Sequence, residues 1–536
     1  MDRLEDMMRD AKAIVLVWLI MIYVIGLAGC RGGELAWNPD QDSGAGDAGI
    51  QEDAAAGDAD SDADTDTDSD TDSDSDTDSD TDTDTDADAD ADADVDADAD
   101  ADVDTDADGD TDAALDGGGD ASADSGLDAA VDSGGDAGLA GRVLYPFGKR
   151  HSPITEELAA HLRALAEAGP GLQDDVFAKM GDSNTVSQYF LDCYTDGVVD
   201  LDGRTELQPT IDWFNGADAG GATPFARISL AANVGWHTGS LLSGSPSPLE
   251  QEVDAVSPRL AVILIGTNDV GLGDIALFTR NLFTIVDQLM SIGVVPLLTT
   301  IPPRDDSAEA DALVPDYNAA IHGVAQARQI PLMDLEHELR KLPGHGLAGD
   351  GIHLDVYVDG GGLGCVLTDA GLEYGHNMRN LVTLESLVRV SAALDGGPAP
   401  DNDAATQQGT GTLADPLEIG SLPYTDLRDT TTDGESRLDA YPACDTVAID
   451  ESGNEVLYRI ALSGTTDVSI RVVALGSTDV DVHLLTDGAS ADTCVAGDDQ
   501  QIDTTLDAGT WWLSIDTRET DAGPTAGEYL LTISGS

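Results

Sequence analysis

Residues 176–185 are Val-Phe-Ala-Lys-Met-Gly-Asp-Ser-Asn-Thr, and the rest of the chain is organised around this stretch. The apolar run that begins at Val176 predicts a buried strand, and Gly181-Asp182 predicts a tight turn directly after it. Ser183 follows the turn, and the apolar spacing from Val186 onward predicts the start of a helix. A serine in this position exposes its hydroxyl at the carboxyl edge of a sheet and places its N–H at the positive end of a helix. Both features suit a nucleophile whose reaction builds an oxyanion.

The charge of the chain is concentrated outside the regions that can fold. The formal net charge is −80 over 536 residues, and most of it comes from a tract in which Asp alternates with Ser, Thr, Ala and Gly. Such a tract has almost nothing apolar to bury and repels itself, so residues 31–140 are predicted to be a disordered, Asp-rich tether. Carboxylates could bind calcium, but strict alternation lacks the ligand loop of a specific site, and a solvated spacer is the preferred interpretation. Nucleic acid is excluded as a partner because no basic patch offsets the acid.

Residues 1–30 predict export and lipid attachment. Arg9 and Lys12 precede an apolar run that ends in Leu27-Ala28-Gly29-Cys30. This ending resembles the bacterial lipoprotein signal, in which cleavage before the cysteine leaves Cys30 lipidated and tied to a membrane. An uncleaved membrane anchor is the alternative. Arg31, rather than Asp, after the cysteine favours an outer-membrane or cell-surface location if lipoprotein sorting habits apply.

The other four cysteines fall in pairs within two apparent domains. Cys193 and Cys365 lie in the first, and Cys444 and Cys494 lie in the second. An even number in each domain fits the disulfides Cys193–Cys365 and Cys444–Cys494 in an oxidising compartment, and free buried thiols are the alternative.

Residues 141–395 predict an α/β domain. Near-continuous apolar strands are expected at 176–180, 225–234, 260–265 and 294–300, and helices are expected at 275–290, 308–328 and 368–393. Strands of this kind alternating with helices indicate a parallel sheet covered on both faces. The ligand site of such a sheet lies at the carboxyl ends of its strands.

The period of the apolar residues changes to two after a linker predicted at 396–412. Short alternating stretches such as Val480-Asp481-Val482-His483-Leu484, separated by Gly, Asp and Thr turns, predict an antiparallel β-sandwich over 413–536. Strand alternation predicts that Trp511 and Trp512 point to opposite faces, one inward and one outward.

Four blocks in residues 141–394 resemble the signature blocks of the SGNH (GDSL-like) hydrolases, in the family order. The blocks are Gly181-Asp182-Ser183, Gly235, Gly266-Thr267-Asn268-Asp269 and Asp350-Gly351-Ile352-His353. The resemblance implies a three-layer α/β/α, flavodoxin-like parallel sheet and an ester hydrolase that acts on lipids, acyl thioesters or acetylated carbohydrates.

The resemblance also implies roles for the matching residues. Ser183 would be the nucleophile, His353 the base that takes its proton, and Asp350 the group that orients the imidazole. The oxyanion hole would combine the Ser183 and Gly235 N–H groups with the side-chain amide of Asn268. No metal or organic cofactor is implied.

Other residues of these blocks have structural interpretations. Asp182 and Asp269 are expected to bond to loop amides. Trp236 and His237 could contact substrate, although a packed aromatic is the preferred interpretation. Gly239 is an alternative to Gly235. The spacing of His345 and His353 fits no usual metal ligand set.

The C-terminal residues resemble, less specifically, the bacterial pre-peptidase C-terminal (PPC) sandwich, in Asp479-Val480-Asp481-Val482, Gly509-Thr510-Trp511-Trp512 and Gly527-Glu528-Tyr529. This module accompanies secreted hydrolases. Together, the sequence predicts an exported, lipid-anchored serine esterase that carries a β-sandwich and acts on a carbohydrate O-acetyl or lipid ester. The rival hypothesis is a surface-binding or adhesion lipoprotein whose hydrolase fold is vestigial.

Overall fold

The computed structural model describes residues 142–402, 404–444, 450–520 and 523–535. The signal, Cys30 and the tether predicted for residues 1–140 lie outside this part of the chain. Among the residues that are described, no helix is both long enough and apolar enough to cross a membrane.

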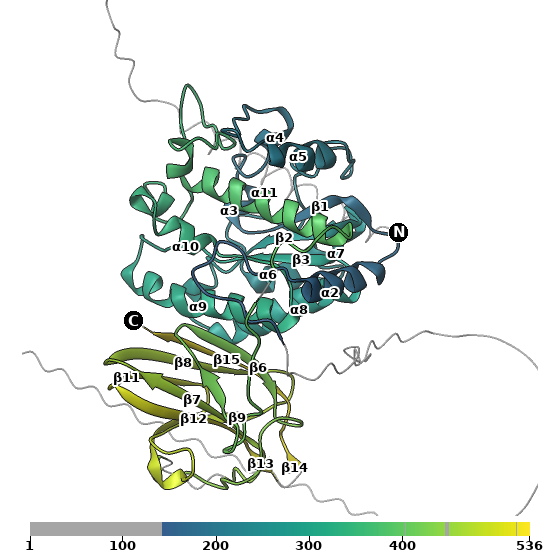
Figure 1. The fold of residues 1–536 in the computed structure, drawn as a ribbon. Helices are drawn as coiled ribbons and strands as arrows, with labels where there is room; N and C mark the ends of the chain where they lie inside the picture. Colours follow the sequence, from purple (N-terminus) through teal and green to yellow (C-terminus); the bar gives the residue numbers. More distant parts are fainter. Residues whose placement is uncertain (1–141, 403, 445–449, 521–522, 536) are drawn as a thin grey trace, which may run out of the picture. The chain divides into compact units, whose positions relative to one another are not determined.

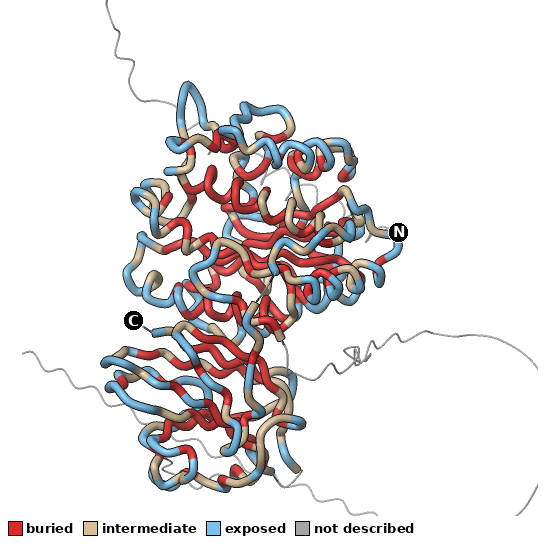
Figure 2. The backbone as a smooth tube through the Cα atoms, in the orientation of Figure 1, coloured by how far each residue is buried: buried red, intermediate tan, exposed pale blue. Residues whose placement is uncertain are grey.

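Four strands form a parallel sheet in the order β1-β2-β3-β4 (Figure 1). They are β1 (Gln173–Gly181), β2 (Pro258–Leu264), β3 (Val295–Thr299) and β4 (Leu332–Met333). The register pairs Met180 with Ile263 and Leu298 with Leu332. Every residue of β2 and β3 is buried, and the buried positions gather along these strands in Figure 2. The parallel pairing confirms the predicted sheet, and the burial of every residue of β2 and β3 shows that both faces of the sheet are covered.

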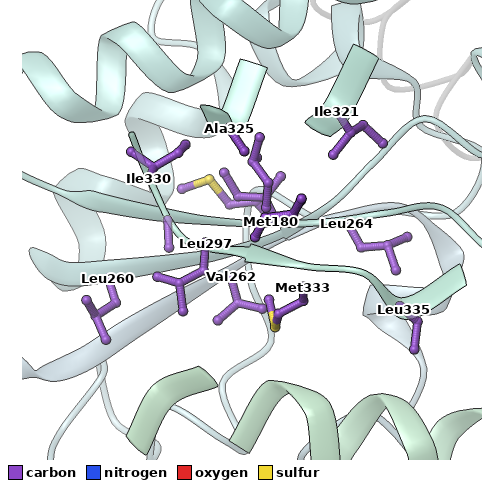
Figure 3. Close-up of a cluster of buried hydrophobic side chains, with 14 of the residues drawn as sticks. Met180, Leu260, Val262, Leu264, Leu297, Ile321, Ala325, Ile330, Met333 and Leu335 are labelled. Atoms are coloured by element: carbon purple, nitrogen blue, oxygen red, sulfur yellow. The ribbon is translucent and has the colours of Figure 1, made fainter. Parts of the chain in front are cut away.

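Helices cover both faces of this sheet and complete the three layers. Figure 3 shows Ile321 and Ala325 of one helix on one side of the strands, and Leu260 and Val262 of β2 directed to the other. The helices are α2 (Glu156–Glu167), α3 (Ser183–Val186), α4 (Cys193–Asp196), α5 (Gln208–Asn215), α6 (Thr238–Leu242), α7 (Pro248–Val256), α8 (Ile275–Ser291), α9 (Ala308–Arg328), α10 (Leu335–Leu339) and α11 (Gly375–Leu394). The helix predicted at 308–328 has the bounds observed for α9, and α8 differs from its predicted range by one residue.

The strand predicted at 225–234 is wrong. Only Ala232 pairs, in a single parallel bridge to Gly181 at the end of β1. The apolar pattern was misleading because its members do not share an environment: Phe225 is fully buried, whereas Ile228 is 88% exposed. The segment is a loop beside the Ser183 turn.

Two predicted helices also differ in length. The helix after Ser183 stops at Val186, because Ser187 leaves helical geometry and its hydroxyl bonds to His376 at 3.0 Å. The last helix begins at Gly375 rather than at 368. A 3-10 turn at Gly371–Glu373 precedes it, and the Asp355 carboxylate accepts the Gly375 N–H at 2.6 Å.

Two further sheets form the predicted sandwich, with strand orders β10-β9-β12-β7-β5 and β11-β8-β15-β6. Their strands are β5 (Leu417–Ile419), β6 (Tyr424–Asp429), β7 (Glu455–Leu462), β8 (Thr466–Ala474), β9 (Val480–Leu485), β10 (Cys494–Asp498), β11 (Gln501–Leu506), β12 (Gly509–Thr517) and β15 (Glu528–Gly535). The short strands β13 (Glu519–Thr520) and β14 (Gly523–Pro524) form a separate two-stranded sheet. Pairing is antiparallel except between β5 and β7, which is parallel. Both sheets contribute to one apolar core, for example Ile515 of β12 and Leu531 of β15.

The two adjacent tryptophans are both half-buried. Trp511 packs on the core between the sheets, and Trp512 packs on a second cluster that contains Tyr441 and Leu485. The opposite directions predicted from alternation are therefore correct, but the outward ring is covered rather than free.

Helix α9 is buried on nearly all sides because the sandwich strands β15 and β6 pack against it. Its Asp316 accepts hydrogen bonds from the hydroxyls of Ser469 at 2.7 Å and Ser534 at 2.6 Å. Gln326 donates to the carbonyl oxygen of Thr425 at 2.9 Å. The segment predicted as a linker also makes ordered contacts, since Thr406 pairs with Val143.

Candidate active site

Backbone geometry exposes Ser183 at the end of β1. Gly181 has φ +152°, and a side chain there would collide with the carbonyl oxygen of Leu264, so glycine is required. Asp182 caps the next helix by accepting the Asn184 N–H at 3.0 Å. Ser183 is then the first residue of α3, and its N–H has no hydrogen-bond partner among the described residues. The local sequence thus leaves both the hydroxyl and an unused amide at the sheet edge.

Asp350 and His353 form a second unit on a single loop. One oxygen of the Asp350 carboxylate accepts the N–H groups of Ile352 at 3.1 Å and His353 at 3.0 Å. The other oxygen lies 2.7 Å from Nδ1 of His353. Gly351 has φ +71° and passes close to the backbone of Asp306, where a side chain would clash. The hydrogen bond from His353 is the main reason that the pKa of Asp350 is lowered, to about 2.

The Ser183 turn and the His353 loop come within hydrogen-bond distance of each other. Nε2 of His353 lies 2.8 Å from Oγ of Ser183, across a sequence separation of 170 residues. Because an ionised Asp350 can only accept, Nδ1 of His353 carries the ring proton and Nε2 is free to accept the serine hydroxyl. The His353 side chain is 44% exposed and that of Asp350 is 51% exposed, so the site is open to solvent.

Two more loops bring amide donors to the same edge. The loop before Gly235 is tied to the end of β1, since Asn233 donates to the Gly181 carbonyl oxygen at 3.1 Å. Gly235 has φ +74°, and its N–H has no partner among the described residues. Asn268, just beyond β2, donates one side-chain N–H to the carbonyl oxygen of Trp236 at 2.8 Å. That bond orients the carboxamide and leaves its second N–H available.

The structural interpretation of Asp269 is confirmed. Its carboxylate accepts the Thr238 N–H at 3.0 Å and the Thr238 hydroxyl at 2.5 Å, which fixes the loop that contains Gly235. His237 also has a structural role, as the N-cap of α6 with Ser240. Trp236 is half-buried against the core. Trp236 and His237, the two aromatic residues after Gly235, are therefore held by packing and capping.

The buried polar residues behind Ser183 were not among the predicted site residues. Arg379 of α11 is 1% exposed and donates to the carbonyl oxygen of Asn184 at 2.7 Å. The side-chain oxygen of Asn184 accepts the N–H of Leu354, the residue after His353, at 3.0 Å. An arginine within an apolar helix was the available signal, but nothing local identifies its partner.

The remaining predicted site residues lie elsewhere. Disulfides join Cys193 to Cys365 and Cys444 to Cys494. His345 pairs with Asp305 at 2.9 Å and not with His353. No cluster of three or more His, Cys, Asp or Glu in the described ranges could hold a metal ion. Two cavities of about 750 and 680 Å³ are lined by other residues, and neither includes Ser183 or His353.

One family model matches the chain. It is described as the GDSL-like Lipase/Acylhydrolase family and matches residues 180–356. These residues contain Ser183, Gly235, Asn268, Asp350 and His353. No curated protein matches the sequence significantly.

Solved structures resemble separate parts of the chain. A GDSL-like lipase from Bacteroides thetaiotaomicron is 16% identical, covers 43% of this chain and 98% of its own, and has a TM-score of 0.27. A catalytic mutant of an acetylxylan esterase from Geobacillus stearothermophilus is 14% identical, with 41% and 96% covered and a TM-score of 0.26. The pre-peptidase C-terminal domain of a collagenase from Bacillus anthracis is 14% identical, with 22% and 92% covered and a TM-score of 0.15.

Proposed function

We propose that this protein, whose residues 180–356 match the model of the GDSL-like Lipase/Acylhydrolase family, hydrolyses carboxylic esters through an acyl-enzyme on Ser183. The observation that carries the proposal is the chain of contacts from Ser183 Oγ to His353 Nε2 at 2.8 Å and from His353 Nδ1 to Asp350 at 2.7 Å. A serine hydroxyl needs an adjacent base to become a nucleophile, and this arrangement supplies one.

The reaction has two halves. His353 takes the Ser183 proton as Oγ attacks the ester carbonyl carbon, and the carbonyl oxygen becomes an oxyanion. Collapse of this intermediate breaks the bond to the alcohol oxygen, which receives the proton from His353. Water then attacks the acyl-enzyme with His353 again as base, which releases the carboxylic acid and regenerates Ser183.

The amide donors act on the negative charge. The N–H groups of Ser183 and Gly235 and the second side-chain N–H of Asn268 are proposed to bind the oxyanion, which exists only during the reaction. Asp350 stays ionised because its pKa is about 2, so it stabilises the imidazolium that forms on His353.

Three valines that are close in sequence to the proposed groups have exposed side chains: Val186 (44%), Val234 (67%) and Val358 (65%). We propose either a lipid ester or an acetylated carbohydrate as the substrate. A panel of nitrophenyl acetate, butyrate and octanoate, with acetylated xylo-oligosaccharides, would separate the two classes.

The test compares the full chain with Ser183→Ala. We expect hydrolysis of nitrophenyl esters by the unmodified chain, a loss of at least about 10³-fold in the variant, and one covalent fluorophosphonate adduct, on Ser183. Equal rates from the two proteins, or an adduct elsewhere, would contradict the proposal. A folded chain with no hydrolysis and no adduct would instead favour the surface-binding hypothesis.

We also propose that the protein is exported and lipid-anchored through Cys30. The sequence Leu27-Ala28-Gly29-Cys30 supports lipid attachment, and the two disulfides are typical of an oxidising compartment. Mass spectrometry of the mature amino terminus should find an acylated Cys30, and Cys30→Ser should release the protein from the membrane fraction. An unmodified Cys30 in a protein that still carries residues 1–29 would indicate an uncleaved membrane anchor.

A further inference from the structure

A buried arginine holds the backbone that follows Ser183. Arg379 is 1% exposed, and its guanidinium carbon lies 3.5 Å from the centre of the Phe190 ring. Nη1 donates to the Asn184 carbonyl oxygen at 2.7 Å, and Nη2 donates to the Thr185 hydroxyl at 3.0 Å. Two donors of one planar group thus bind consecutive residues of α3, a fixed fork that lysine cannot reproduce.

The residue next to the nucleophile is also tied to the residue next to the base. The side-chain oxygen of Asn184, which is 1% exposed, accepts the Leu354 N–H at 3.0 Å. Ser183 and His353 precede these two partners directly in the sequence. Arg379 therefore fixes Asn184, and Asn184 fixes the loop that presents His353.

Stability alone does not account for this arrangement. Taking a guanidinium out of water costs several kcal/mol, and apolar residues of similar volume often replace buried ion pairs without loss of stability. Here Nε of Arg379 and Nδ2 of Asn184 are buried without hydrogen-bond partners in the described residues. Burial also lowers the pKa of Arg379 to about 9. The negative charge of Asp182, a buried carboxylate, acts in the other direction and raises this pKa.

We propose that Arg379 and Asn184 are positioning residues that hold Ser183 Oγ within reach of His353 Nε2. The inference rests on the proposed ester hydrolysis, in which neither residue touches the substrate. It places control of the nucleophile in helix α11, which lies outside residues 180–356.

The principal test is Arg379→Met in the full chain. A misplacement of about 1 Å at a reacting group costs on the order of 10²-fold. We therefore expect kcat to fall about 10- to 100-fold, KM to change less than about twofold, and fluorophosphonate labelling of Ser183 to slow in proportion to kcat. Arg379→Lys should restore little, because the ammonium group cannot bind both acceptors.

The matched control is Arg389→Met on the same helix. Arg389 donates to the Ser152 carbonyl oxygen at 2.9 Å and to Asp401 at 2.8 Å, away from the Ser183 turn. We expect a lower Tm with unchanged kcat at temperatures where the variant is folded. If both variants lose activity only in proportion to the unfolded fraction, Arg379 is merely structural and the inference is overturned.

A second pair of variants covers the case in which Arg379→Met does not fold. Thr185→Val removes the hydroxyl that accepts from Nη2, and Thr185→Ser keeps it. We expect slower labelling of Ser183 in the valine variant and recovery in the serine variant. Equal labelling rates in the two would contradict the inference.

The unmodified chain separates the two possible failures. If its Ser183 is not labelled, the proposed function fails and the positioning role fails with it. If its Ser183 is labelled and the Arg379→Met chain is labelled equally fast, only the positioning role fails.

Discussion

The hydrolase domain and the sandwich both bury charged groups, but only the hydrolase domain does so beside Ser183, the proposed nucleophile. In the hydrolase domain, Arg379 and Asp182 lie behind Ser183, which opens to solvent with His353. In the sandwich, the Tyr441 hydroxyl donates to the buried carboxylate of Asp516 at 2.6 Å.

The two networks differ in what their hydrogen bonds reach. The sandwich groups bond mainly to one another: His483 lies 2.8 Å from Glu451, and its ring stacks on Tyr441 with centroids 3.6 Å apart. Behind Ser183, Arg379 donates to the backbone of Asn184 and to the side chain of Thr185, both in α3, the helix that begins at Ser183. Burial of a charged group alone therefore does not identify a functional site. A hydrogen bond from such a group to the helix of the proposed nucleophile is the more specific indication.

The largest effect is expected from Asp350→Asn. The carboxylate orients the His353 ring, so its loss should lower kcat on the order of 10²- to 10⁴-fold. The lower end of this range applies because Asp350 is exposed and water can replace part of its interaction with the ring. Asp359→Asn, an exposed carboxylate on the same loop, should leave kcat unchanged. Steady-state kinetics with a nitrophenyl ester measure both. An Asp350→Asn chain with the original kcat would show that Asp350 does not orient His353 for the reaction.

Asn268→Asp should lower kcat on the order of 10²- to 10³-fold, with a small change in KM. The shape of the side chain is kept, but the N–H donors are lost and the carboxylate repels the oxyanion. The hydrogen bond to the Trp236 carbonyl oxygen is lost as well. A kcat within about twofold of the unmodified value would show that Asn268 does not bind the oxyanion.

Tyr441→Phe tests the buried hydrogen bonds that join Tyr441 to Ser514 and Asp516 in the sandwich. Asp516 would lose a buried donor, so the free energy of unfolding should fall by about 1–3 kcal/mol. Urea unfolding measures this change, and kcat should stay the same in the folded protein because no bond of Tyr441 reaches the Ser183 edge. A selective loss of kcat would show that the two domains are coupled in catalysis.

The smallest effect concerns acid stability. Burial lowers the pKa of His376 to about 3, below the ordinary value of about 6.5. Between these values the unfolded chain binds one more proton at this residue, so stability rises with pH and falls on acidification. The loss is about 2 kcal/mol at pH 5. His376→Gln should flatten the dependence of Tm on pH between 6.5 and 5. If His376→Gln keeps the acid dependence of the original chain, the acid sensitivity comes from other groups.

Local patterns predicted much of the hydrolase fold. The strands β2 and β3 and the helix α8 were recognisable because burial on both faces gives a strand a nearly continuous apolar run, and burial of one face gives a helix a helical period. The strand predicted at 225–234 was wrong because that prediction also depended on the local pattern alone. Its apolar residues imitate a strand, but no neighbouring strand pairs with them beyond Ala232.

The kinds of groups at the site and the turns that present them follow from local sequence. The positive φ of Gly181 and the helix cap of Asp182 place Ser183 at the sheet edge, and Asp350 holds the His353 loop through hydrogen bonds to residues two and three positions away. The meeting of the two turns does not follow from local sequence. It depends on hydrogen bonds that join Asn184 to Leu354 and to Arg379, across 170 and 195 residues, and only the packing of the folded chain brings these residues together.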